Sequence, residues 1–191
     1  LIGDGLGHVA VTGVALGLVV NRAPVLVALA TAVAGAVAVE LIRARREAIG
    51  EVALAILFYG GIAGGVVLVT RAPSGGRNLD QYLFGAITTT TPGDVWLFAV
   101  LAAVVLLATT VLGTALFSVS NDEQFARAAG VPVTALNLLL AVLSALTVVV
   151  SMRVVGVLLV SALIVVPVAT AQLLARSFRG TYLAGLGIGA F

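Results

Sequence analysis

Long apolar runs separated by short polar segments make up most of this chain. A helix needs about 20 apolar residues to cross the hydrocarbon core of a bilayer. By that measure the pattern predicts six membrane-spanning helices, and a seventh that begins near residue 181. The six expected ranges are 5–20, 24–42, 50–70, 95–117, 134–152 and 154–175.

One apolar stretch is too short to cross. It is 79–91, "LDQYLFGAITTTT", and it is followed directly by Pro92 and Gly93. We expect a half-helix or a re-entrant element here. Irregular backbone at membrane depth is tolerated only where it packs against protein or faces a wet cavity.

Composition supports the same interpretation. Hydrophobic residues make up 61% of the 191 residues, charged residues only 9%, and the mean hydropathy is +1.23. Soluble domains carry about 25% charged residues. The sequence therefore predicts an all-α, polytopic transmembrane bundle, with residues 1–191 forming one domain. Since the chain has no initial methionine and both ends fall inside apolar runs, we expect a fragment truncated at both ends.

The arginines indicate an orientation. The segment 41–51, "LIRARREAIGE", holds three of the ten basic residues, and short loops rich in arginine are typically cytoplasmic. Alternation then places 118–134 and 176–180 on the same side. Arginines spread over many loops report topology rather than a nucleic-acid surface, so we expect a membrane location and no nucleic-acid partner.

Several catalytic classes are excluded by missing residues. The chain has no lysine, which a nucleotide-binding P-loop requires, and no cysteine for thiol chemistry. Its single histidine cannot form an HExxH zinc site, and no GxSxG motif occurs. We therefore expect a protein that is not an enzyme and has no ATPase motif of its own.

The first apolar run contains two ionisable residues four positions apart, Asp4 and His8. On a helix they share one face with Thr12. Ionisable residues inside a membrane are costly and usually face a cavity or a partner. A carboxylate and a neutral imidazole are good ligands for divalent ions such as Zn²⁺ or Mn²⁺. The alternative is that Asp4 caps the helix and His8 bonds to it or to a carbonyl.

A polar stretch at 120–137 is the next candidate. Ser120 or Asn121 can cap a short helix that has Asp122 and Glu123 in its first turn, and Gly130 with Pro132 can end it. This segment is either a solvated linker or a cytoplasmic docking helix for another subunit.

Two further features concern the spans themselves. Pro167 lies in the middle of 154–175, where it should kink the helix and either line a gate or serve packing. Gly13 with Gly17, and Gly61 with Gly65, have the four-residue spacing that lets helices approach closely in lipid. For these glycines we favour ordinary bundle packing.

Three motifs in order resemble the metal-ion ABC permeases of the zinc, manganese and iron class. "GDGLGHVAVTGVALG" is similar to that family's "GDALSHAVLPGVALG" type of motif, although Gly5 and Gly7 replace its Ala and Ser. "DEQFARAAGVPV" resembles its cytoplasmic D-x-x-x-A-x-x-x-G segment. "VVGVLLVSALIVVPVATAQLLA" resembles its "VVGxLLVxALLxxPAATAxLLA" segment, where Arg153 stands near the position of a frequent glutamine.

The resemblance implies a permease subunit of the prokaryotic cytoplasmic membrane that imports a divalent metal ion by alternating access. The ion is then the cargo, and no covalently bound cofactor is expected. The implied partners are cytoplasmic ATP-binding subunits, an extracytoplasmic solute-binding protein and a second permease copy. Asp4 and His8 would face the metal path. The docking residues would be Asp122, Glu123, Ala126, Ala129 and Gly130.

Two other functions remain open at this point. One is an ABC permease for iron-chelate or cobalamin-type cargo, against which the 6% aromatic content argues mildly. The other is an ion-coupled secondary transporter that works alone and uses Asp4 and His8 as a proton or ion relay.

Overall fold

The computed structural model describes residues 2–20, 23–45, 47–71, 82–85, 91–175 and 177–190, and all regular structure within them is helical. The expected all-α fold is therefore confirmed. In chain order the helices are α1 (Ile2–Val19), α2 (Pro24–Arg45), α3 (Glu47–Arg71), α5 (Pro92–Val111), α6 (Gly113–Asn121), α7 (Glu123–Ala128), α8 (Val133–Val155), α9 (Val157–Leu174) and α10 (Phe178–Gly189).

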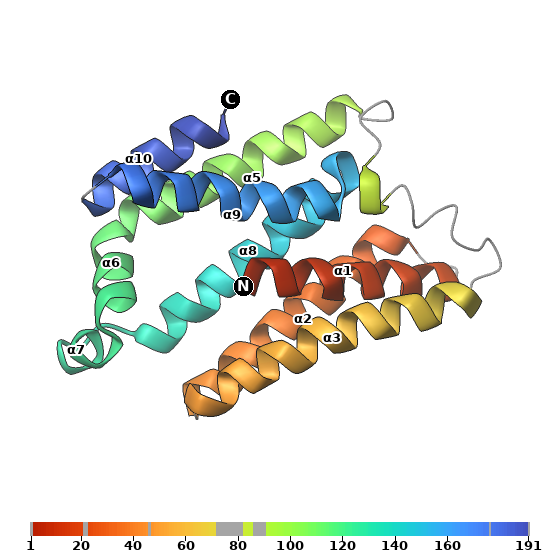
Figure 1. The fold of residues 1–191 in the computed structure, drawn as a ribbon, viewed down its shortest axis with the longest axis horizontal. Helices are drawn as coiled ribbons and strands as arrows, with labels where there is room; N and C mark the ends of the chain where they lie inside the picture. The colour runs from red at the N-terminus through yellow and green to blue at the C-terminus, as the bar shows by residue number, and fades with distance from the viewer. Residues whose placement is uncertain are drawn as a thin grey trace.

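Five of these helices, α2, α3, α5, α8 and α9, are long and apolar enough to cross a membrane, and α1 is a shorter apolar helix. The expected span 95–117 is wrong at its end, because α5 stops at Val111 and α6 begins a new direction at Gly113 (Figure 1). The hydroxyls of Thr109 and Thr110 donate to carbonyls of the preceding turn, which bends helices. The following glycine then favours a break.

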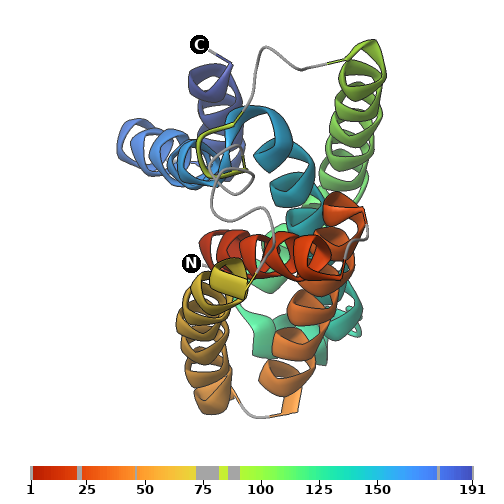
Figure 2. The same cartoon turned by 90° about the vertical axis from the view of Figure 1, so that its right-hand side faces the viewer.

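The connections gather at two opposite ends of the bundle (Figure 1). The end of α1, the start of α2, the end of α3, the start of α5 and the turn from α8 to α9 lie at one end. The end of α2, the start of α3, α7, the end of α9 and the start of α10 lie at the other. This alternation agrees with the expected sidedness of the arginine-rich loops. Figure 2 shows α1, α2 and α3 together in the lower part of the view, α9 and α10 side by side at the upper left, and α5 apart from them at the upper right.

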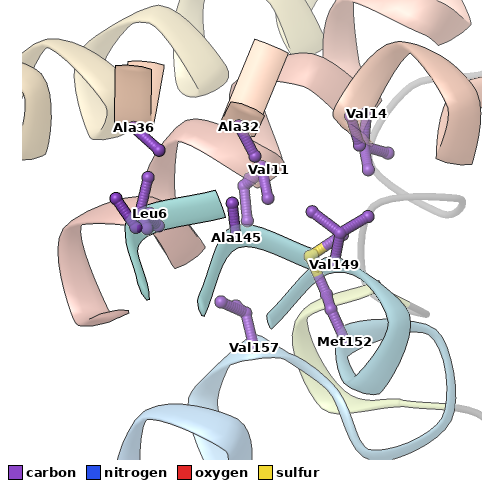
Figure 3. Close-up of a cluster of buried hydrophobic side chains, with 12 residues drawn as sticks. Leu6, Val11, Val14, Ala32, Ala36, Ala145, Val149, Met152 and Val157 are labelled. Atoms are coloured by element: carbon purple, nitrogen blue, oxygen red, sulfur yellow. The ribbon is translucent and has the colours of Figure 1, made fainter. Parts of the chain in front are cut away.

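Helix α1 is the centre of the packing, with α2, α3, α8 and α9 all against it. Figure 3 shows the apolar cluster where α1, α2, α8 and α9 meet. Its members are mostly small or β-branched, so they fill the space between backbones that lie close together. The cluster comprises Leu6, Ala10, Val11, Val14, Ala28, Ala32, Ala36, Ala141, Ala145, Val149, Met152 and Val157.

Glycines make these close approaches possible. A Cβ built on Gly13 would lie 2.6 Å from the Cα of Ala28 in α2, and one on Gly17 would lie 2.7 Å from the Cα of Pro24. Both distances are too short for real atoms, so the two helices meet backbone to backbone. The packing interpretation of the glycine pair in α1 is confirmed.

The segment predicted as a half-helix lies partly within the described residues. Residues 82–84 are helical, whereas 79–81 and 86–90 lie outside the part that the structure describes. Gly85 and Gly156 both have φ above +80° and their backbones cross. A Cβ on Gly156 would stand 2.5 Å from the backbone nitrogen of Gly85. The short helix is thus seated on the turn between α8 and α9.

The same end of the bundle is joined by an ion pair. Nη1 of Arg153, in the last turn of α8, lies 2.6 Å from Oδ1 of the buried Asp94. Asp94 also forms a capping box with Thr91 at the start of α5. The ion pair therefore holds the beginning of α5, a helix that otherwise contributes little to the core, against the end of α8.

Helix α9 continues through Pro167 without ending. The proline is buried, and Gly189 of α10 approaches its ring carbons, with an ideal Cβ at 3.8 Å. The hydroxyl of Thr170 donates to the carbonyl of Val166 rather than to that of Leu163, which the proline leaves without its helical donor. These contacts favour packing against α10, and the gating role of Pro167 stays a prediction.

The crossing at Gly156 can be tested against Gly130, which has a similar φ of +81° but no heavy atom within 4 Å of an added Cβ. Gly130→Ala should cost only the backbone term, about 1–2 kcal/mol. Gly156→Ala adds a backbone clash, so we expect roughly 2–5 kcal/mol. Thermal unfolding of the two variants in detergent should rank them in that order. Equal losses would contradict the crossing.

Candidate functional site

The single histidine lies at the middle depth of the bundle. His8 is half-buried on α1, and its ring meets that of Phe58 edge-on, with centroids 4.6 Å apart at 76°. Phe58 is close to the midpoint of α3, which runs from Glu47 to Arg71. Because α3 is long and apolar enough to cross a membrane, the imidazole lies beside the middle of a candidate span rather than at its end. Substrate sites of transporters commonly lie near that depth.

Asp4 belongs to the same uninterrupted helix as His8, one turn earlier. The two positions therefore share a face of α1, as the spacing predicts. The side chain of Asp4 lies outside the described part of the structure, so the ligand role of the pair stays a prediction. The described residues contain no group of three or more acidic, histidine or cysteine side chains that could hold a metal.

Thr12, the third member of the expected polar face, has a structural task. Its hydroxyl lies between the carbonyl oxygen of Gly61 in α3 and that of His8, the latter at 3.3 Å. The hydroxyl donates to these two carbonyl oxygens, and the bond to Gly61 links α1 to α3. Thr12 is thereby occupied by backbone, directly beside the histidine.

Gly61 is the residue that brings α3 up to the histidine. A Cβ at Gly61 would lie 3.1 Å from the carbonyl carbon of His8 and 3.1 Å from the nitrogen of Val9. Gly65, one turn later, faces Val11 and Thr12. The expected packing role of this glycine pair is confirmed. The spacing of the two glycines did not reveal that Gly61 lies opposite His8.

The second candidate region is helix α7, and its predicted start is wrong. The N-cap is Asp122 rather than Ser120 or Asn121, with Oδ1 accepting from the backbone nitrogen of Phe125 at 2.9 Å. A carboxylate accepts such bonds well and favours the positive end of a helix. The hydroxyl of Ser120 instead donates to the carbonyl oxygen of Leu116.

The end of α7 agrees with the prediction in part. Gly130, with φ of +81°, follows the helix and ends it. Pro132 does not belong to this ending, because it is the N-cap of α8. Helix α7 is thus shorter than expected, Glu123–Ala128, and it is joined to α8 by a tight turn.

The residues predicted for docking do not share one face of α7. Ala126 is fully buried and packs with Val119, Val133 and Leu136, so it holds α7 against α6 and α8. Ala129 and Gly130 are exposed. Phe125 is 66% exposed. It was not among the predicted residues, although a phenylalanine in a polar segment is a signal that could have indicated it.

The whole chain, residues 1–191, matches the model of the ABC 3 transport family. The chain belongs to this family. The resemblance drawn from the three motifs is therefore confirmed. With its apolar helices, the family membership makes it a multi-pass protein of the prokaryotic inner membrane.

Relatives with known names come from several bacteria. The manganese transport system membrane protein MntC of Halalkalibacterium halodurans is 30% identical over 174 residues, which cover 91% of this chain and 60% of that protein. The manganese import system permease protein ScaB of Streptococcus gordonii is 29% identical over 190 residues, 100% of this chain and 68% of that protein. The high-affinity zinc uptake system membrane protein ZnuB of Haemophilus influenzae is 27% identical, with 92% and 67% covered.

A solved structure has the same fold. PsaBC from Streptococcus pneumoniae, in complex with Fab, superimposes with a TM-score of 0.79 at 29% sequence identity. The match covers 98% of this chain and 68% of that one. The chain thus spans about 60–68% of the length of the relatives that it matches.

The close contact at Gly61 generates a prediction about the site. Gly61→Ala should force α3 away from α1 beside His8, because the added carbon meets backbone. We expect a loss of about 1–3 kcal/mol in stability. Gly60→Ala is the matched control, since its Cβ would meet nothing within 4 Å. Thermal unfolding of both variants in detergent tests this, and two equally stable proteins would contradict the contact.

Proposed function

We propose that this chain is part of the permease subunit of an ATP-driven importer that moves divalent metal ions across the inner membrane. One observation supports this above the others. The Asp4 and His8 positions lie one turn apart on α1, at mid-membrane depth, in a chain of a family whose relatives are named for manganese and zinc transport. The metal is the cargo, and manganese, zinc or iron is the expected ion.

The donor chemistry of the pair fits this cargo. An imidazole nitrogen and a carboxylate are ligands that Zn²⁺ and Mn²⁺ accept. Two side chains are too few to complete a coordination shell, so water or a second copy of the chain supplies the remaining donors. An incomplete shell suits a transport path, because binding must be weak enough to release the ion.

Cytoplasmic ATP-binding subunits are the expected source of energy, and they would dock on α7. Its exposed side offers Phe125 and Ala129 as apolar contacts. Glu123 and Arg127, paired at 2.7 Å, flank them as the polar rim. ATP hydrolysis then belongs to these partners, and an extracytoplasmic solute-binding protein delivers the ion.

Alternating access needs a mechanical link from α7 to the metal path. Ala126 anchors α7 on the first turn of α8, through Val133 and Leu136. Helix α8 in turn packs on α2 and α1, where Ala145 and Val149 join the central cluster. A movement of the docking helix is therefore passed to the helix that carries His8 through continuous packing.

The site assignment predicts the effect of removing a ligand. His8→Ala and Asp4→Ala should each lower metal uptake by at least about tenfold, because even the loss of a residue that only supports a metal ligand costs about 10–100-fold. Membrane insertion should be unaffected. Thr147→Val is the control, because its hydroxyl is partly buried and only bonds the carbonyl of Leu143. Uptake of ⁵⁴Mn and ⁶⁵Zn by cells with the complete transporter is the measurement. Normal uptake in both variants would disprove the assignment.

The docking surface makes a separate prediction. Ala129→Asp places a charge on the exposed end of α7 and should abolish co-purification with the ATP-binding subunits. Arg179→Asp is the control, since Arg179 is exposed in the first turn of α10 and does not line the cavities beside α7. Both variants should be produced in equal amounts. ATPase binding that survives Ala129→Asp would reject α7 as the docking helix.

A further inference from the structure

A buried carboxylate near the end of α2 has no role in the proposed metal site. Glu40 is only 3% exposed. The other buried acidic residue of the described chain, Asp94, has its capping box and the guanidinium of Arg153. Across the described residues, Glu40 has no hydrogen-bond or salt-bridge partner. A buried charge without a partner is costly, so its retention calls for a reason.

Glu40 lines a polar cavity of about 180 Å³. The cavity lies between α2, α7 and α8. Glu123 and Arg127 of α7 line it, together with Asn137 of α8 and with Arg43 and Arg45, which follow Glu40 on α2. No fully buried side-chain oxygen of the described residues lacks a hydrogen bond. The carboxylate of Glu40 therefore reaches the water of this cavity, on the side where the docking helix lies.

Two carboxylates thus face one cavity with three guanidinium groups, those of Arg43 and Arg45 on α2 and that of Arg127 on α7. Because Arg43 and Arg45 belong to the same helix as Glu40, Arg127 is the one of these three that can link Glu40 to α7. Nη2 of Arg127 lies 2.7 Å from Oε1 of Glu123, and its side chain is 57% exposed. Such exposed pairs one helical turn apart contribute little to stability. Arg127 also has five N–H donors, so it can give up or share Glu123 at small cost. The carboxylate of Glu40, which lines the same cavity, is then a second acceptor available to Arg127.

We infer that Glu40 is a positioning residue, which couples movement of α7 to α2 by receiving Arg127 in one state of the transport cycle and releasing it in the other. Arg127 pairs with Glu123 in the structure described here. When α7 closes on the cavity, Arg127 bridges to Glu40 and draws α2 with it. This inference rests on the proposed function, because it needs an ATPase that moves α7.

A displacement of α2 would be passed on to its neighbour α1. Helix α2 meets α1 backbone to backbone, at Gly13 against Ala28 and at Gly17 against Pro24. Contacts of that kind leave no room for one helix to slide independently of the other. A displacement of α2 is therefore carried into α1, which holds Asp4 and His8. Glu40 would join the docking helix to the metal path by a second route, beside the apolar one through α8.

The test measures coupling rather than activity alone. The complete permease is reconstituted with its ATPase subunits in proteoliposomes, and Mn²⁺ uptake and ATP hydrolysis are followed together. Glu40→Gln should leave assembly and ATP hydrolysis in place and lower the Mn²⁺ transported per ATP by about two- to thirty-fold, the range seen for residues that carry coupling. Arg127→Gln should lower the same ratio, and the double variant should lose no more than the single variants.

Further variants separate coupling from folding. Glu40→Asp keeps the charge and should recover part of the ratio, whereas a merely structural role would give no such rescue. Arg179→Gln removes a guanidinium from α10 and should keep the ratio of the unaltered protein. If Glu40→Gln does not assemble, Glu40→Asp takes its place beside Arg127→Gln and in the double variant, because it keeps the charge and shortens the side chain that would reach Arg127. An unchanged ratio in Glu40→Asp would then overturn the coupling role.

The outcomes are distinct. An unchanged ratio in Glu40→Gln or in Arg127→Gln, or additive losses in the double variant, would overturn the coupling role of Glu40 and leave the proposed function intact. If the unaltered complex shows no ATP-driven Mn²⁺, Zn²⁺ or Fe²⁺ uptake at all, the proposed function fails, and the coupling role fails with it.

Discussion

The backbone-to-backbone contacts of α1 are the constraint on which the rest of the structure depends. In lipid there is little hydrophobic force between apolar helices, so association relies on close packing and on backbone contact. Gly13 and Gly17 bring α1 onto α2, and Gly61 brings α3 onto α1. At these crossings the helix backbones are so close that almost no free space remains between them. The position of His8 is thereby set by neighbours on two sides.

Under the proposed function, this constraint would also let the short helix α7 act on His8. Helix α7 has six residues and one buried anchor, Ala126, so it has little stability of its own. A tight turn joins it to α8, and Ala126 packs on the first turn of that helix. Since α8 and α2 both pack on α1, packed helices connect α7 to the helix that carries His8. The buried charge of Glu40 at the α2–α7 cavity is unusual in such a setting, and coupling gives it a physical reason.

Much of the fold could be predicted from the sequence, because apolar length and glycine spacing are local properties. The spans expected at 24–42 and 134–152 correspond to α2 and α8 within a few residues. The span expected at 95–117 was wrong, because its apolar character continues through Leu112 while the helix bends there. The cap of α7 was also misplaced, since Ser120, Asn121 and Asp122 are all good N-cap residues and only the path of the chain selects Asp122.

The sequence by itself determined that the chain is a helical membrane protein, which family motifs it carries, and that Asp4 and His8 share a helical face. These follow from composition, order and spacing along one chain. Only the tertiary structure decided that His8 meets Phe58 and Gly61, that Thr12 bonds to backbone, and that Glu40 and α7 line one cavity. The physical reason is that these contacts join helices far apart in sequence, and their register depends on how closely the backbones can approach.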